Sequence, residues 1–304
     1  MGTIAITGAT GFVGSAVLDV ARQKALSVRA LTRRPQADEA RIDWVRGTLD
    51  DEEALAQLVS SADAVIHIAG LTNTPNPGRF EAANVTGTAN VIAAAKAAGV
   101  GRLVFVSSLA AREPDLSAYG ASKARAETVV KDCAMDWTIV RPPAVYGPRD
   151  KDMFELFRSA KFGIVPVPPE GRTSIIHVED LARLLIALVP GSEMTRGKTY
   201  EPWDDNAFGY DHAELGTLIA EAVGNPGALT PKLPASIMRL GASVDGLVRG
   251  SKAKLTPDRV GYMLHPDWVC DMKKAPPLSL WQAVWSGPEG LKMTADWYKK
   301  EGWL

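Results

Sequence analysis

Residues 8–14, with the sequence GATGFVG, constrain the fold of this chain more than any other segment. They follow an apolar run at 3–7 and open an amphipathic stretch at 12–23, so the three glycines lie in a strand-to-helix turn. A turn without Cβ atoms lets backbone N–H groups approach a pyrophosphate, and a helix N-terminus adds about half a positive charge there. The segment therefore predicts a dinucleotide-binding turn, in which Gly14 allows the helix to pack closely on the sheet.

The rest of the first half alternates short apolar runs with helical stretches, as in β-α-β units around a buried parallel sheet. We expect strands at 3–7, 27–32, 43–46, 64–68, 103–107 and 138–141, and helices at 12–23, 51–60, 84–98 and 118–133. The pattern loosens after Pro142, yet strand, helix and strand are expected again at 175–178, 179–189 and 199–202. The clustered tryptophans near the C-terminus are interpreted as core anchors.

These elements predict an α/β fold of the Rossmann type, a doubly wound parallel sheet with a smaller, interleaved C-terminal substrate domain. The expected NAD(P)-binding domain spans 1–165. The expected substrate-binding region spans 166–304, with about 175–203 returning to the first domain.

Composition and charge exclude several classes of partner. With 34 basic and 35 acidic side chains the net charge is −1, so no broad field attracts nucleic acid or anionic lipid. The longest apolar run, 184–189, is far shorter than the roughly 20 residues that span a bilayer. The two cysteines and four histidines show neither a disulfide framework nor metal-ligand spacing. We expect a cytoplasmic protein with a small-molecule substrate and no metal, nucleic-acid or membrane partner, and we leave a homodimer open.

The end of the expected second strand bears on the identity of the cofactor. An acid about 20 residues past the glycines binds the free ribose 2′-hydroxyl of NAD. This chain has Arg33 and Arg34 there and no carboxylate. Guanidinium groups suit a 2′-phosphate, so NADP is favoured over NAD, against the alternative that both arginines form a solvated surface pair.

Tyr119 and Lys123 are four residues apart, which places them on one helical face. Proton transfer by a phenol near neutrality requires a pKa about 3 units below its ordinary value, and a lysine charge about 4 Å away supplies most of that shift. Ser107 and Ser108 end an apolar strand at the sheet edge where open α/β folds bind ligands. The pattern predicts a Ser108–Tyr119–Lys123 acid–base site, in which Ser108 orients a carbonyl or an alcohol.

These motifs, with RPPAVYGP at 141–148 and the aromatic pattern at 297–303, resemble the extended short-chain dehydrogenase/reductase superfamily of the NAD-dependent epimerase/dehydratase type. The resemblance runs nearly end to end and implies catalytic roles for Ser108, Tyr119 and Lys123. It also implies that Asn84 supports the lysine through a kinked helix and water. The cofactor contacts that the resemblance implies are Thr10, Phe12, Val13, Leu49, Ala69, Gly70, Pro142 and Val145. The glycine turn and the strand ends add the expected contacts Gly8, Gly11, Gly14, Arg33 and Ser107.

Two departures from the superfamily pattern bear on the substrate. Thr48 replaces the acid expected at the adenine edge, which leaves Leu49 to pack on the ring. Arg172 lies one place off the register of the arginine that clamps the diphosphate of sugar nucleotides, and in a strand this slip turns its side chain to the opposite face. The chain therefore resembles the atypical branch that includes reductases of apolar carbonyl substrates.

Three functions remain. The first is an NADP-dependent oxidoreductase that transfers hydride between nicotinamide and a carbonyl or alcohol by Ser-Tyr-Lys chemistry. The second is an epimerase or dehydratase that returns the hydride within one turnover. The third is a non-catalytic NADP-binding sensor or assembly protein, against which the complete Ser-Tyr-Lys set counts. The substrate and the direction of reaction stay open.

Overall fold

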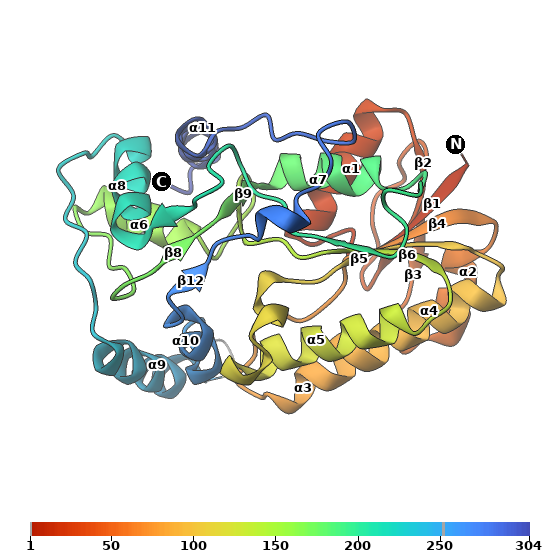
Figure 1. The fold of residues 1–304 in the computed structure, drawn as a ribbon, viewed down its shortest axis with the longest axis horizontal. Coiled ribbons are helices and arrows are strands. Elements are labelled where there is room, and N and C mark those ends of the chain that lie inside the picture. Colours follow the sequence, from red (N-terminus) through yellow and green to blue (C-terminus); the bar gives the residue numbers. More distant parts are fainter. Residues whose placement is uncertain (1, 251–252) are drawn as a thin grey trace.

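A seven-stranded sheet forms the centre of the computed structural model, which describes residues 2–250 and 253–304 (Figure 1). All neighbouring strands pair in parallel, in the order β10-β6-β5-β4-β1-β2-β3. The strand order reverses between β1 and β4, which is where doubly wound sheets bind their ligands. The predicted Rossmann fold is confirmed. The strands are β1 (Thr3–Thr7), β2 (Ser27–Thr32), β3 (Ile42–Arg46), β4 (Ala62–His67), β5 (Arg102–Val106), β6 (Asp136–Val140) and β10 (Lys198–Tyr200).

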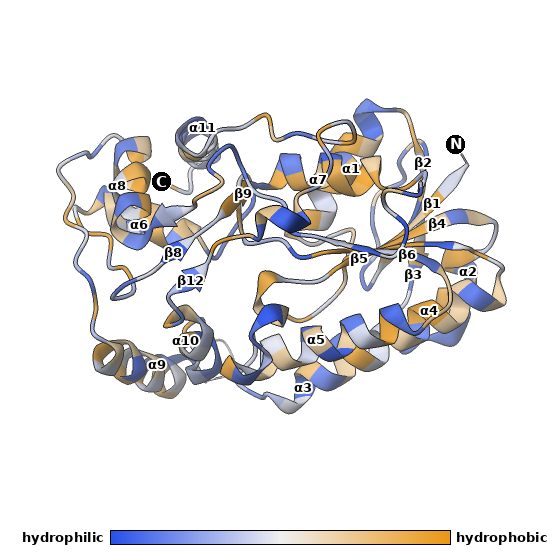
Figure 2. Ribbon diagram, viewed as in Figure 1, coloured by the Kyte–Doolittle hydropathy of each residue, from blue (hydrophilic) through white to orange (hydrophobic). Residues whose placement is uncertain are grey.

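Helices cover both faces of this sheet because alternate strand residues point to opposite sides. Ile4 and Ile6 of β1 belong to the core shared with α1 (Phe12–Gln23) and α7 (Val178–Ala187). Ala5, between them, belongs to the core on the other face. The helices of that second face are α2 (Glu52–Val59), α4 (Gly87–Ala97) and α5 (Ala118–Lys131). In Figure 2 the ribbons of α1 and α7 carry long hydrophobic segments, as expected of helices that cover a sheet.

The helix expected at 84–98 begins earlier than predicted. A short α3 (Gly78–Phe80) leads into a π-helical turn at Glu81–Thr86, and α4 follows without interruption. Asn84 lies in the π-helical turn with its side chain buried, and tertiary hydrogen bonds hold it there. Such single wide turns commonly mark functional sites, and their long-range contacts leave no periodic signal in the sequence.

The region after β6 contributes to two further cores. Tyr298 and Phe157 centre the first, which joins α6 (Phe154–Lys161), α8 (His212–Val223) and α11 (Gly287–Lys300). The second lies between α9 (Ala235–Arg249) and α10 (Pro257–Met263). The remaining strands form two small sheets: β7 (Ala144–Tyr146) with β9 (Ile175–His177), and β8 (Arg172–Thr173) with β11 (Tyr210–Asp211) and β12 (Asp267–Trp268).

Part of this region rejoins the large sheet. The strand β10 pairs with β6, and α7 packs on α1. Trp281 donates its indole N–H to the carbonyl of Asp180 and thereby ties the C-terminal segment to α7. Trp297 and Trp303, by contrast, pack around Tyr298 in the smaller core. The boundary between residues 165 and 166 stays a prediction. Within residues 2–250 and 253–304, no helix is both long and apolar enough to cross a membrane.

Candidate active site

The glycine turn joins β1 to α1 and leaves almost no room for side chains. Gly8 has a φ of +75°, and a Cβ there would come within 2.6 Å of the backbone nitrogen of Ala69. A Cβ on Gly14 would lie 2.0 Å from the carbonyl oxygen of Gly8. The first turn of α1 therefore rests directly on the strand end, as a turn that cradles a pyrophosphate must.

The N-terminus of α1 has the features of an anion-binding site. Gly11 at the N-cap offers no side chain to the backbone N–H groups, and the first turn contains no acid. The neighbouring α2 differs, because Asp51 caps it and Glu52 follows. Open N–H groups and the positive end of the helix dipole suit the cofactor's diphosphate. The predicted contacts here comprise two exposed residues and two that are partly buried: Thr10, Gly11, Phe12 and Val13.

Three arginines gather where β2 and β3 end. Arg33 and Arg34 are exposed just after β2, and the β2–β3 register sets Arg46 beside Thr32. In the described part of the chain, none of the three forms an ion pair with an acid. Leu49 is partly buried against α4, where Asn90 donates to its carbonyl. The sequence did not indicate Arg46 as a candidate, because only the pairing of β2 with β3 brings it to this edge.

The end of β4 contacts the glycine turn through a buried polar chain. Thr7 Oγ1 lies 2.6 Å from His67 Nδ1, and His67 Nε2 lies 2.9 Å from Thr88 Oγ1, whose own proton goes to the carbonyl of Asn84. The network assigns the proton of His67 to Nε2. Burial first, and the Lys123 charge second, lower the pKa of His67 to about 3, so the imidazole is neutral. Ala69 and Gly70, both predicted contacts, follow directly on the open side.

The two serines after β5 serve different partners. The hydroxyl of Ser107 is buried and donates to Glu127 Oε1 at 2.6 Å. Glu127 also receives two hydrogen bonds from Arg141. Ser108 is only partly buried, accepts a hydrogen bond from the N–H of Ala110 and is near enough to Tyr119 to lower the pKa of its phenol. The hydroxyl of Ser108 is therefore partly accessible to a ligand, whereas the hydroxyl of Ser107 is buried and bonded to Glu127.

Tyr119 lies in the first turn of α5 among apolar and aromatic side chains. Its ring centroid is 5.8 Å from that of Phe80 and 6.1 Å from that of Tyr262. Burial raises the pKa of Tyr119 to about 12, while the Ser108 side chain and the charge of Arg259 lower it in part. Desolvation of the phenolate therefore outweighs the groups that lower this pKa, and Lys123 is not one of those groups. The expectation that Lys123 lowers this pKa stays a prediction.

Lys123 is buried one turn farther along α5. Its Nζ donates to the carbonyl of Val106 at 2.8 Å and lies 4.6 Å from the centre of the Phe105 ring. Burial lowers the pKa of Lys123 to about 8, and the carboxylate of Glu127 opposes this shift. A Cβ on Gly70 would come within 3.8 Å of the ammonium, so the backbone after β4 passes close to it. The ammonium therefore faces the same open edge as Ser108.

Asn84 supports this helix by a direct contact. Its side-chain amide donates to Ser122 Oγ at 2.9 Å and to the carbonyl of Leu71, and its oxygen accepts from the N–H of Leu71. Asn84 thus joins the loop after β4 to the residue beside Lys123. Its predicted support of the lysine through water stays a prediction.

The remaining predicted contacts follow β6. Pro142 is buried, and its carbonyl accepts from the N–H of Leu109. Val145 lies in β7 and packs partly against the core of the large sheet. Pro142 therefore lies beside the loop that carries Ser108, and the cofactor contacts of both residues stay predictions.

Sequence reasoning missed the cover over Tyr119. Asp258 at the start of α10 accepts hydrogen bonds from the N–H groups of Ala118 and Tyr119, 139 residues away in sequence from the latter. Tyr262 of the same helix packs against Tyr119, and Trp268 donates to the carbonyl of Tyr262. No local pattern could have indicated these residues, because only the folded chain brings α10 to α5.

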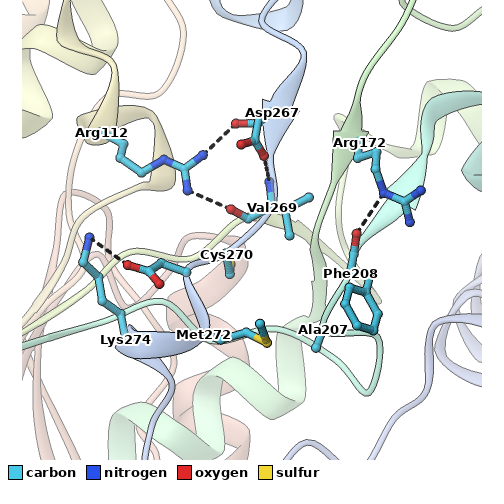
Figure 3. Close-up of a pocket in the computed structure, with 10 residues that line it drawn as sticks. Arg112, Arg172, Ala207, Phe208, Asp267, Val269, Cys270, Met272 and Lys274 are labelled. Carbon is cyan, nitrogen blue, oxygen red and sulfur yellow. Dashed lines mark hydrogen bonds and ion pairs between the residues drawn. The ribbon is translucent and has the colours of Figure 1, made fainter.

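A pocket of about 920 Å³ lies beyond this cover, between β12 and the loop at 207–208 (Figure 3). None of the predicted catalytic residues lines it. Arg112 donates to the carbonyls of Asp267 and Val269, and Arg172 donates to that of Phe208 (Figure 3). Arg172 also donates to the carbonyl of Gly209. Both guanidinium groups therefore brace loops. The predicted loss of a diphosphate clamp agrees with this use of Arg172.

Comparison with known proteins decides the family. Residues 4–201 match the model of the NAD-dependent epimerase/dehydratase family. The chain belongs to this family. It is 35% identical to the ceramide reductase of Caulobacter vibrioides (strain NA1000 / CB15N) over 314 residues, covering 100% of this chain and 96% of that protein. It is 31% identical to the 2-alkyl-3-oxoalkanoate reductase of Stenotrophomonas maltophilia (strain K279a) over 254 residues, covering 73% of this chain and 76% of that one.

Solved structures agree on the fold. The Bordetella bronchiseptica enzyme WbmH, determined in complex with NAD+, superposes with a TM-score of 0.77 at 20% identity and covers 99% of each chain. Together with the family match, the relatives identify an NAD(P)-dependent enzyme of the short-chain dehydrogenase/reductase type. The predicted superfamily is therefore confirmed, whereas the roles of the individual site residues stay predictions.

Proposed function

We propose that this family member is an NADPH-dependent reductase that converts a ketone flanked by long alkyl chains into a secondary alcohol. One observation carries the proposal: Tyr119, whose pKa the hydroxyl of Ser108 lowers in part, lies within an otherwise apolar and aromatic cluster. Such a site offers a proton and a hydrogen bond to one oxygen atom and apolar surface to the rest of the ligand.

The protonation state of Tyr119 favours reduction. A pKa of about 12 keeps the phenol protonated near neutral pH, so it enters the reaction as a proton donor. Tyr119 would give its proton to the carbonyl oxygen, which Ser108 would hold by a hydrogen bond. Lys123 is cationic below about pH 8 and would bind the ribose hydroxyls beside the reacting ring. The reduced nicotinamide, when bound, supplies the hydride that the carbonyl carbon accepts.

The residues present fit this cofactor. The uncapped start of α1 and the glycine turn, which a Cβ would fill, suit the diphosphate. Arg33, Arg34 and Arg46 suit a ribose 2′-phosphate, since no described acid neutralises them. These arginines support NADPH over NADH.

The substrate class is inferred from what surrounds Tyr119. Phe80, Ala110, Leu71, Tyr262 and Trp268 form an apolar cluster around it. Arg172 is engaged with backbone carbonyls and leaves no clamp for a sugar-nucleotide diphosphate. The names of the two reductase relatives describe lipid substrates, and one name specifies an oxo group next to an alkyl branch. All three observations favour a carbonyl carried on long apolar chains.

A chain-length series tests the proposal. The purified chain is supplied with NADPH and with 3-oxo esters whose alkyl chains grow stepwise, and alcohol formation is compared with NADPH consumption. We expect one alcohol per NADPH and a kcat/KM that rises about threefold for each added methylene until the apolar site is filled. Conversion of a nucleotide sugar without net NADPH consumption would establish the epimerase function instead. Tight NADPH binding without turnover of any ketone or nucleotide sugar would indicate the non-catalytic function.

A further inference from the structure

The helix α9 exposes a continuous apolar stripe. Its exposed apolar side chains recur at helical spacing, so they share one face. All five are at least half exposed: Ile237 51%, Leu240 64%, Val244 50%, Leu247 87% and Val248 77%. In Figures 1 and 2, α9 lies at the outer edge of the molecule, beside α10 and away from the large sheet, with hydrophobic segments along its ribbon.

This stripe is a local concentration of apolar surface. Of the thirteen large hydrophobic side chains that are exposed among the described residues, five lie in this one helix. The opposite face of α9 packs against α10, where Met238 and Ala242 form a small core with Val260. Scattered exposed apolar residues need no explanation, whereas a contiguous patch marks a surface that contacts another phase or molecule.

Basic residues accompany the stripe. The segment 229–254 contains five lysines or arginines and one acid, a net charge of +4 in a chain whose net charge is −1. The acid, Asp245, accepts hydrogen bonds from the backbone N–H groups of Lys254 and Leu255 and pairs with Arg249. Arg239 is exposed and pairs with no described acid. Lys254 pairs with Glu155, so among the described residues of α9 Arg239 is the exposed cation that no acid neutralises, and it is complementary to anionic headgroups.

The same helix pair reaches the candidate active site. On one side α10 packs against α9 through Val260, and on the other its Tyr262 ring contacts Tyr119. Asp258 accepts from the first N–H groups of α5, including that of Tyr119. The loop after β4 is tied to the same place, because Asn73 donates to the carbonyls of Ala253 and Lys254. The helix α10 therefore lies between α9, which carries the apolar stripe on its outer face, and the predicted proton donor.

We propose that α9 lies in the surface of a lipid bilayer that contains anionic phospholipid, with its apolar stripe among the acyl chains and its arginines at the headgroups. A helix with one apolar face, a cationic polar side and no spanning length has the features of an interfacial anchor. Binding to the bilayer does not depend on the proposed reaction. Its use, which is to bring a membrane-borne ketone beside α10 and Tyr119, rests on the proposed function. The proposal departs from the expectation of no membrane partner, which considered only spanning segments, covalent anchors and net charge.

Vesicle flotation tests the proposal without any turnover. The full chain is mixed with vesicles of phosphatidylcholine containing about one-third phosphatidylglycerol, and the bound fraction is measured after centrifugation. We expect Leu247→Ser with Val248→Ser to lower the partition coefficient at least about tenfold, since each loses buried apolar surface. We expect Arg239→Gln to lower it about fivefold, and pure phosphatidylcholine or high salt to weaken binding in the wild-type chain.

A matched control is available within the chain. Leu278 and Val284 are 80% and 68% exposed, close to the values for Leu247 and Val248, but lie outside α9. Leu278→Ser with Val284→Ser should leave flotation unchanged, and melting temperatures check that each variant is folded. The proposal is overturned if the wild-type chain does not float, or if both double variants float equally well. It is also overturned if Leu247→Ser with Val248→Ser converts a vesicle-free dimer into a monomer while flotation stays unchanged, because the stripe would then belong to a second copy.

Discussion

The two ends of the candidate cofactor site use charge in opposite ways. At the adenine end, Arg33, Arg34 and Arg46 are exposed beside water at the termini of two strands. At the nicotinamide end, Lys123 and Tyr119 are buried, and desolvation moves both pKa values toward the neutral forms. Exposed cations attract a phosphate and are screened by salt, whereas buried groups change their protonation state. We therefore expect the open adenine end to select the cofactor and the closed nicotinamide end to control proton transfer.

The largest effect should come from the closed end. Tyr119→Phe removes the proton donor and keeps the ring, so kcat for ketone reduction should fall about a thousandfold with little change in the KM for NADPH. Tyr262→Phe is the control, because that ring packs against Tyr119 and lacks the predicted role. A kcat of Tyr119→Phe within threefold of wild type would remove this residue from the chemistry.

A change in the glycine turn at residues 8–14 should weaken the binding of NADPH and NADH equally. Gly14→Ala places a Cβ 2.0 Å from the carbonyl oxygen of Gly8, so α1 must shift away from the strand end. We expect KM to rise about a hundredfold for NADPH and for NADH, because the misplaced turn serves the diphosphate common to both. Gly101→Ala has no atom within 4 Å of the added Cβ and should leave both KM values unchanged. A selective effect on NADPH alone would contradict the assignment of this turn.

The open end should be selective. Arg33→Ala with Arg34→Ala removes two cations from the expected 2′-phosphate site, and KM for NADPH should rise about thirtyfold. KM for NADH should stay within twofold, since that cofactor carries no phosphate there. Arg125→Ala is the matched control. Arg125 is also exposed, but it lies in α5 and pairs with Glu81, away from the expected 2′-phosphate site. Equal losses for both cofactors would show that the arginines act on the fold and not on the phosphate.

The smallest effect is a pH dependence at the closed end. Lys123 is cationic below its pKa of about 8, so kcat should fall about tenfold for each pH unit above that value. The free energy of unfolding should instead increase over part of this pH range. The unfolded lysine keeps its proton up to about pH 10.4, so between about pH 8 and 10.4 the unfolded state binds more protons and the free energy of unfolding gains from rising pH.

Lys123→Arg separates these two trends. The guanidinium stays charged, so the falling limb of the kcat profile should move above pH 10 even where the overall rate is lower. A kcat profile that falls at pH 8 in both proteins would assign the limb to another group. Melting temperatures recorded across the same pH range exclude unfolding as the cause.

Much of the fold was predictable because its signals are local. The glycine spacing, the apolar runs and the turn residues predicted the strands of the large sheet and the helices that cover it, mostly within about two residues of their observed ends. The helices of the smaller region, such as α8 and α9, were not predicted. The start of the helix around Asn84 was missed, since its wide turn depends on hydrogen bonds to Leu71 and Ser122. The exposure of the apolar stripe of α9 was also missed, because the sequence does not show which face of a helix packs against the rest of the chain.

The candidate site divides in the same way. Ser108, Tyr119 and Lys123 were found from a strand end and a four-residue spacing. Their environment was not, because Asp258 and Tyr262 come from a helix far along the chain. The sequence alone established the backbone requirements of the dinucleotide turn and the spacing of the tyrosine and lysine, since both are set by covalent neighbours. Only the tertiary structure decided the burial and hence the pKa values of these groups, because solvation depends on contacts between segments that are distant in sequence.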